Sequence, residues 1–166
     1  FAQLFIAFSN PVLGVLVGAL VTAVIQSSSA SVGILQALAS TGVVSYGSCV
    51  PIIMGQNIGT CVTALLSSVG TNKNARRAAM VHLLFNVIGA TLLLTVFCII
   101  KAIFAPAILN ESASLVGIAT IHSLFNLLCT LIMLPLGGLL QKVVCLIVPD
   151  KKQDDKKNEL DERLIV

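Results

Sequence analysis

Two stretches of the chain are apolar over the length of a membrane span. Residues 78–100 and 113–134 contain few polar positions, and residues 101–112 join them through a short link that contains Pro106. A hydrocarbon core about 30 Å thick takes about 20 helical residues to cross. The pattern therefore predicts two transmembrane helices that run in opposite directions.

The first 72 residues carry no charged side chain, yet polar or glycine-containing breaks divide them into half-length apolar stretches. The order is an apolar stretch at 11–25, a break at 26–31 and an apolar stretch at 32–39, followed by 49–54, a break at 55–60 and 61–69. Broken helices at membrane depth are tolerated where protein or a water-filled cavity surrounds them, and in transporters they mark the binding site. We predict a re-entrant helical hairpin with residues 26–29 at its tip, followed by a discontinuous helix broken at Asn57.

Composition and charge agree with an all-α membrane protein. The chain is 57% hydrophobic and 10% charged, with a mean hydropathy of +1.01, whereas soluble domains carry about 25% charged residues. Residues 73–149 contain six of the charged side chains and residues 150–166 contain eleven. We therefore divide the chain into a membrane domain at 1–149 and a charged tail at 150–166. The net charge of +3 is too small to suggest nucleic acid as a partner.

The basic residues predict the orientation. Lys73, Arg76 and Arg77 precede the first span, and Lys142 follows the second, whereas Glu111 lies in the link between them. Because basic loops stay in the cytoplasm, we expect a multi-pass protein of the cell membrane with a cytoplasmic tail and with the Glu111 loop outside. Residues 136–148 are too short to cross and are predicted to form an interfacial helix on the cytoplasmic surface.

The first break has the chemistry of an anion site. Four consecutive polar residues sweep about 300° of a helix, so either protein encloses the helix or the backbone unwinds there. An unwound segment would expose the start of the next helix, whose N–H groups bind oxyanions without a basic side chain. The residues concerned are Gln26, Ser27, Ser28 and Ser29.

The second break offers oxygen atoms suited to a hard cation such as sodium. They come from Gln56, Asn57 and Thr60, together with backbone carbonyls that Gly55 and Gly59 would free. Close packing of helices through the pairs Gly14/Gly18 and Gly55/Gly59 is the competing explanation. An activated nucleophilic serine is disfavoured because no GxSxG motif and no neighbouring acid or histidine accompanies the serines, and we expect no enzymatic activity.

Two further features suggest structural roles. The five cysteines are odd in number and no two are closer than twelve positions, so no CxxC metal or redox motif exists. The pattern H-x-L-F-N occurs at residues 82–86 and again at 122–126. Because His and Asn four apart share a helix face, we expect both pairs to form hydrogen bonds between helices. A role of either histidine in binding a proton or solute is the alternative. No cofactor is expected beyond sodium as a coupling ion.

The motif Gln26-Ser27-Ser28-Ser29, followed by Gly55-Gln56-Asn57-Ile58-Gly59-Thr60, resembles the paired QSSS and G-x-N-I-G-T motifs of the type II sodium-phosphate cotransporter family, in particular the second repeat of bacterial members. This resemblance implies two inverted repeats that together surround phosphate and sodium. It also implies that Gln26, Ser27, Ser28, Ser29, Gln56, Asn57 and Thr60 bind substrate, with Ser28, Ser29, Asn57 and Thr60 contacting sodium. Gln56 replaces the small residue that is more usual in this motif.

The chain holds one copy of each motif, so we expect a half-transporter, either a fragment or a self-associating half, that needs a complementary repeat from the same or a second chain. The end of the tail weakly resembles the junction to a cytoplasmic PhoU-like domain. The predicted function is sodium-coupled symport of inorganic phosphate across the cytoplasmic membrane. The alternative is a membrane-embedded phosphate sensor or regulatory subunit without net transport.

Overall fold

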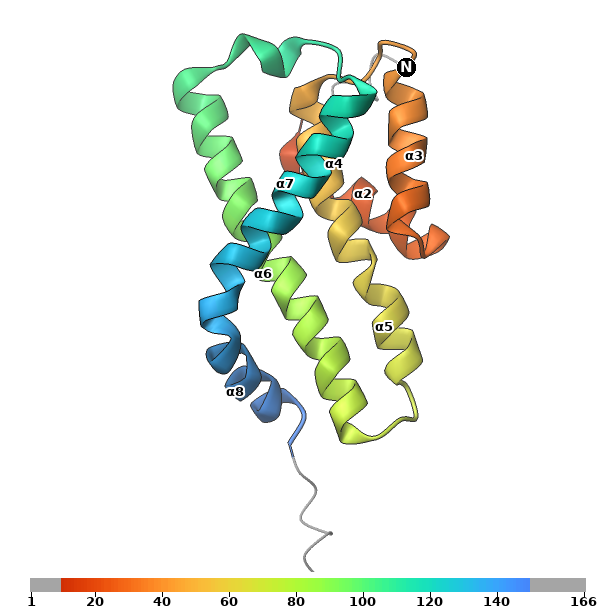
Figure 1. Cartoon of the computed structure of the whole chain (residues 1–166), viewed down its shortest axis with the longest axis vertical. Coiled ribbons are helices and arrows are strands. Elements are labelled where there is room, and N and C mark those ends of the chain that lie inside the picture. Colours follow the sequence, from red (N-terminus) through yellow and green to blue (C-terminus); the bar gives the residue numbers. More distant parts are fainter. Residues whose placement is uncertain (1–9, 150–166) are drawn as a thin grey trace, which may run out of the picture.

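The computed structural model describes residues 10–149, and over this range the chain is helical without β-strands (Figure 1). The α-helices are α2 (Pro11–Ile25), α3 (Ser28–Ala39), α4 (Tyr46–Gly59), α5 (Cys61–Ser68), α6 (Lys73–Phe104), α7 (Leu115–Met133) and α8 (Gly137–Ile147). Two short 3-10 helices, η1 (Ala107–Asn110) and η2 (Leu134–Leu136), connect the last three. The tail at 150–166 lies outside the described residues.

Three helical segments are long and apolar enough to cross a membrane. They are Lys73–Phe104, Leu115–Ile147 and Tyr46–Ser68, and they include both spans expected from the sequence. The third combines α4 and α5. The all-helical membrane class is thus confirmed, with one more candidate span than the apolar pattern predicted.

Helices α2 and α3 form a hairpin that is too short to cross. Their 15 and 12 residues correspond to about 22 and 18 Å at 1.5 Å per residue. Figure 1 shows the turn at mid-height of the molecule, and α3 then runs back to the end at which α4 begins. The helical hairpin expected at residues 11–39 is therefore present.

The helix that follows is not broken at Asn57, and this prediction was wrong. Helix α4 runs through Gly59, and the interruption is confined to Thr60, whose backbone angles of −62° and −25° are still helical. Gly55 and Gly59 are needed for close packing and do not unwind the chain. A methyl group at Gly55 would overlap the carbonyl of Val15, and one at Gly59 would overlap that of Ala19.

The contact between α2 and α4 is the most extensive between any two helices of the described chain. Gly14 lies against Pro51, and Gly18 lies against Ile52 and Gln56, so the two helices run parallel. The small-xxx-small packing that competed with the ion-site hypothesis for this segment is therefore present.

Helices α6 and α7 brace this pair. Cys49, Ile53 and Ile118 are fully buried in a core between α3, α4 and α7. A second core joins α4, α6 and α7 through Met54, Ala90, Phe125 and Cys129. The hairpin and α4 are thus held on one side of the two long spans.

Candidate functional site

The helical conformation is interrupted at the beginning of the predicted serine motif. Gln26 ends α2 in the left-handed conformation, with φ 58° and ψ 23°, and its N–H donates to Thr22 O at 2.6 Å. Ser27 is extended and caps α3, because its Oγ accepts the N–H of Ala30 at 3.3 Å. Ser28 and Ser29 form the first turn of α3. The helix interruption predicted for this run is confirmed, and it occupies Gln26 and Ser27.

The start of α3 is open on the surface of the described chain. Gln26, Ser27 and Ser29 are exposed and Ser28 is half-buried. Within residues 10–149, the hydroxyls of Ser28 and Ser29 form no hydrogen bond, and the first turn carries no acidic residue. Unpaired N–H groups at a helix start attract an anion through about half a positive charge. The tip therefore offers hydroxyls and main-chain N–H groups together.

Gln56 lies one layer behind the tip. Only 2% of its surface is exposed, and its Nε2 donates to Ser31 O at 3.0 Å. Since a carbonyl only accepts, this bond fixes the amide orientation and leaves Gln56 Oε1 buried without a partner. Thr22 Oγ1 and Ser31 Oγ are buried and unpartnered as well. One orphaned oxygen thus comes from each of α2, α3 and α4.

Thr22 and Ser31 were not among the residues predicted from the sequence. Each lies one turn from the break, Thr22 before Gln26 and Ser31 after Ser27. Residues four apart share a helix face, so this spacing is the signal that could have found them. Their complete burial against α4 depends on the tertiary fold.

Asn57 and Thr60 bond to their own helix. Asn57 Nδ2 donates to Ile53 O at 2.9 Å, and Thr60 Oγ1 donates to Asn57 O at 2.6 Å. Cys61 Sγ also donates to Asn57 O, at 3.8 Å. We expected the backbone to unwind at residues 55–60 and free its carbonyl groups. This was wrong, because the helix is almost continuous and Asn57 O accepts hydrogen bonds from Thr60 and Cys61.

The two motifs nevertheless lie at the same level of the fold. Thr22 and Ala23, at the end of α2, lie against Gly59 at the end of α4. The hairpin turn at Gln26 therefore follows one turn after this contact, beside the α4–α5 junction. Across residues 10–149, no three His, Cys, Asp or Glu residues are placed to hold a metal ion, so any cation here would depend on neutral oxygens.

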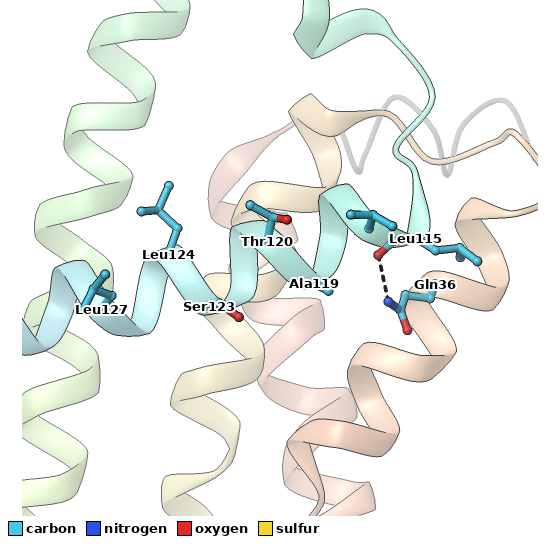
Figure 2. A pocket seen from close by; sticks show the side chains of 8 residues that line it. Gln36, Leu115, Ala119, Thr120, Ser123, Leu124 and Leu127 are labelled. Carbon is cyan, nitrogen blue, oxygen red and sulfur yellow. Dashed lines mark hydrogen bonds between the residues drawn. The ribbon is translucent and has the colours of Figure 1, made fainter.

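Two hollows flank the hairpin. A cavity of about 430 Å³ lies between α2, α3 and α4, and Ser31 and Gln56 are among its few polar lining residues. An open groove of about 600 Å³ follows α7, and Figure 2 shows Leu115, Ala119, Thr120 and Ser123 along it. At its end, Gln36 Nε2 donates to Leu115 O at 2.9 Å and ties α3 to α7.

The repeated histidine motif acts within each helix. Asn86 Nδ2 donates to His82 O at 3.0 Å, and Asn126 Nδ2 donates to His122 O at 2.8 Å. The predicted hydrogen bonds of these pairs between helices are therefore replaced by bonds one turn apart. Cys61 Sγ, which donates to His82 O at 3.5 Å, supplies the link from α5 to α6.

Comparison with known proteins gives one consistent family. Residues 2–137 match the Na+/Pi-cotransporter family. Over 136 residues, the chain is 34% identical to the uncharacterized protein YqeW of Bacillus subtilis (strain 168), covering 82% of this chain and 43% of the relative. Over 92 residues, it is 46% identical to sodium-dependent phosphate transport protein 2A of Rattus norvegicus, covering 52% of this chain and 14% of the relative.

A further relative is named for phosphate export. Over 143 residues, the chain is 26% identical to "Putative inorganic phosphate export protein YjbB" of Escherichia coli (strain K12), covering 86% of this chain and 26% of the relative. The chain thus spans less than half the length of each of these relatives. No solved structure matches the chain.

Proposed function

Because the chain belongs to the Na+/Pi-cotransporter family, we propose that it forms half of a membrane transporter that moves inorganic phosphate and sodium in the same direction. The observation that carries this proposal is the hairpin tip. There the chain leaves helix at Gln26 and Ser27 and presents the start of α3 at mid-height of the molecule. A binding site near the middle of the membrane is the arrangement that alternating access requires.

The hairpin tip would bind phosphate through uncharged hydrogen-bond donors and the dipole of α3, without a basic side chain. In this proposal, Gln26, Ser27, Ser28 and Ser29 donate to phosphate oxygens together with the first N–H groups of α3. Since no Lys or Arg precedes Lys73 in the sequence, the anion charge would be offset by the helix start and by sodium bound beside it. Desolvating an unpaired ion is costly, which gives a physical basis for binding both ions together.

Sodium would take neutral oxygens near the α4–α5 junction. The hydroxyls of Ser28 and Ser29 are without partners in the described chain, and in this proposal Asn57 and Thr60 would supply further oxygen atoms from α4 and its C-terminal end. Their present bonds to the backbone of α4 would have to open or be shared when the ion binds. Gln56 would contribute its unpartnered Oε1 from behind the tip.

A complementary repeat would enclose the site. Gln26, Ser27 and Ser29 are exposed in this half, whereas a transported ion must be shielded from bulk water. The YqeW relative is more than twice as long as its matching segment, which leaves room for such a repeat. The tail would be cytoplasmic and could join a PhoU-like domain, and the three candidate spans would make the protein multi-pass.

The first test is Ser28→Ala in the full-length protein, reconstituted in vesicles with an imposed sodium gradient. Losing a hydrogen bond to a charged ligand costs about 1.5–3 kcal/mol, so we expect the apparent KM for phosphate to rise about tenfold or more. Ser67→Ala is the matched control, because Ser67 is an exposed serine on α5. Unchanged kinetics and sodium dependence in Ser28→Ala would contradict the site assignment.

Export is the second candidate, and the Escherichia coli relative favours it. Vesicles separate the candidates when labelled phosphate is supplied outside to measure influx and inside to measure efflux. Influx that follows an inward sodium gradient supports symport, whereas sodium-independent efflux supports export. Binding of phosphate without flux in either direction would support the sensor alternative.

A further inference from the structure

The charged residues of the membrane domain are segregated to its two ends. Lys73, Arg76 and Arg77 lie in the first turns of α6, and Lys142 lies on α8. Lys101, in the last turn of α6, and Glu111, just after η1, belong to the opposite end. In Figure 1, the start of α6 and α8 are both at the lower end of the molecule. Over residues 10–149, that end therefore carries four cations and no acidic side chain.

Helix α6 is long enough to carry its basic turns out of the hydrocarbon. Its 32 residues correspond to about 48 Å, whereas a hydrocarbon core is about 30 Å thick. Basic side chains at the start of such a helix would lie at the depth of the lipid headgroups.

Helix α8 is attached to this basic end. Leu140, Val144 and Val148 are buried at successive turns, and α8 packs against α6. Arg77 Nε donates to Val148 O at 3.0 Å, which joins the end of α8 to the first turns of α6. The two helices that carry these four cations are therefore joined at this end of the molecule.

The outward face of α8 consists of large apolar side chains and one basic side chain, Lys142. Leu139 is 61% exposed, Val143 38% and Leu146 82%, and Lys142 is exposed beside them. A helix that exposes large apolar side chains together with a lysine fits the boundary between headgroups and acyl chains. Free phosphate would use the cations but would leave the apolar face without a role.

We propose that the start of α6 and α8 together bind the phosphate headgroup of an anionic membrane lipid. Arg76 and Lys142 contact the headgroup, and Leu139, Val143 and Leu146 lie against its acyl chains. This site is separate from the hairpin tip and depends on the membrane location of the chain, but it does not depend on phosphate transport.

The test is native mass spectrometry of the full-length protein in detergent, titrated with phosphatidylglycerol or with zwitterionic phosphatidylcholine. A basic residue near an anionic surface contributes about 1 kcal/mol, so Lys142→Gln and Arg76→Gln should each weaken phosphatidylglycerol binding about fivefold. Lys101→Gln removes the same charge from the opposite end and should leave binding unchanged. Both tested side chains are exposed, and a thermal melt of each variant checks that it is folded.

Three outcomes would overturn the proposal. The first is equal affinity of the wild-type protein for the two lipids, and the second is an equal loss in Lys101→Gln. The third is displacement of phosphatidylglycerol by millimolar inorganic phosphate, which would make this end an anion site without lipid specificity. Leu146→Gln separates the apolar contribution, because it should weaken binding of both lipids while the preference for phosphatidylglycerol persists.

Discussion

Gln26 occupies a backbone conformation that glycine would adopt more easily. Its φ of 58° is in the left-handed region, which costs a residue with a side chain roughly 1 kcal/mol or more. Glycine is the usual residue just after a helix end for this reason. A strained glutamine at the turn of the hairpin is consistent with a side chain retained for its amide.

Replacing Gln26 with Gly should therefore separate stability from function. We expect the free energy of unfolding to rise by up to about 1 kcal/mol while phosphate transport by the full-length protein falls sharply. Ala105→Gly is the matched control, because Ala105 also has a positive φ, at 38°, and follows the far end of α6. Thermal unfolding in detergent and vesicle flux measure the two effects, and wild-type flux in Gln26→Gly would show that the amide is dispensable.

The buried hydroxyl of Thr22 allows a second test at the level of a single residue. Its hydroxyl is completely buried and has no partner, and an unsatisfied buried polar group costs about 1–3 kcal/mol. Thr22→Val keeps the shape and removes the hydroxyl, so we expect about 1 kcal/mol of added stability without sodium. Thr91→Val is the control, since the Thr91 hydroxyl is satisfied by Val87 O at 2.7 Å.

The sodium dependence of that result is equally informative. If sodium stabilises the wild-type protein but not Thr22→Val, the hydroxyl contributes to an ion site. A loss of stability in sodium-free buffer would contradict the assignment of Thr22 Oγ1 as an unsatisfied group.

At the scale of elements, the same kind of sequence signal had two different physical causes. The serine run predicted a helix break and the structure has one, because Gln26 turns left-handed and Ser27 caps α3. Gly55 and Gly59 also suggested a break, yet they allow α2 and α4 to approach within backbone contact. Sequence spacing alone does not distinguish these roles, because the partner helix of a GxxxG pair is known only from the fold.

Gly55→Ala tests the packing role. The new methyl group would overlap Val15 O, so α2 and α4 must separate, at a cost of about 2–3 kcal/mol. Gly33→Ala is the matched control, because nothing lies within 4 Å of the new methyl group and alanine is favoured over glycine in a helix interior by about 0.5–1 kcal/mol. A lower melting temperature for the first variant and an equal or higher one for the second are expected. Equal melting temperatures would show that α2 and α4 do not depend on this contact.

For the whole molecule, the apolar pattern predicted the long spans and the short hairpin correctly, but it did not predict how the candidate site is distributed. Gln26 to Ser29 and Gln56 to Thr60 come to the same level, yet the first set is mostly exposed and the second is largely buried. Length and hydropathy determine which segments can cross. Which of the polar side chains become buried together depends on how the helices pack, and that packing is not encoded in length or hydropathy.

The orientation of the whole molecule gives the last prediction. Four of the five cations within residues 10–149 lie at the end formed by α8 and the start of α6, and basic ends are retained in the cytoplasm. In a Cys98→Ser/Cys145→Ser background, Asn110→Cys should react with a membrane-impermeant maleimide on intact cells. Asn74→Cys should react only after permeabilisation, since it lies between the basic residues. Both asparagines are exposed and the other three cysteines are buried, so labelling reports the side of the membrane. The reverse pattern would place the basic end outside, and the lipid site and the cytoplasmic tail would both have to be abandoned.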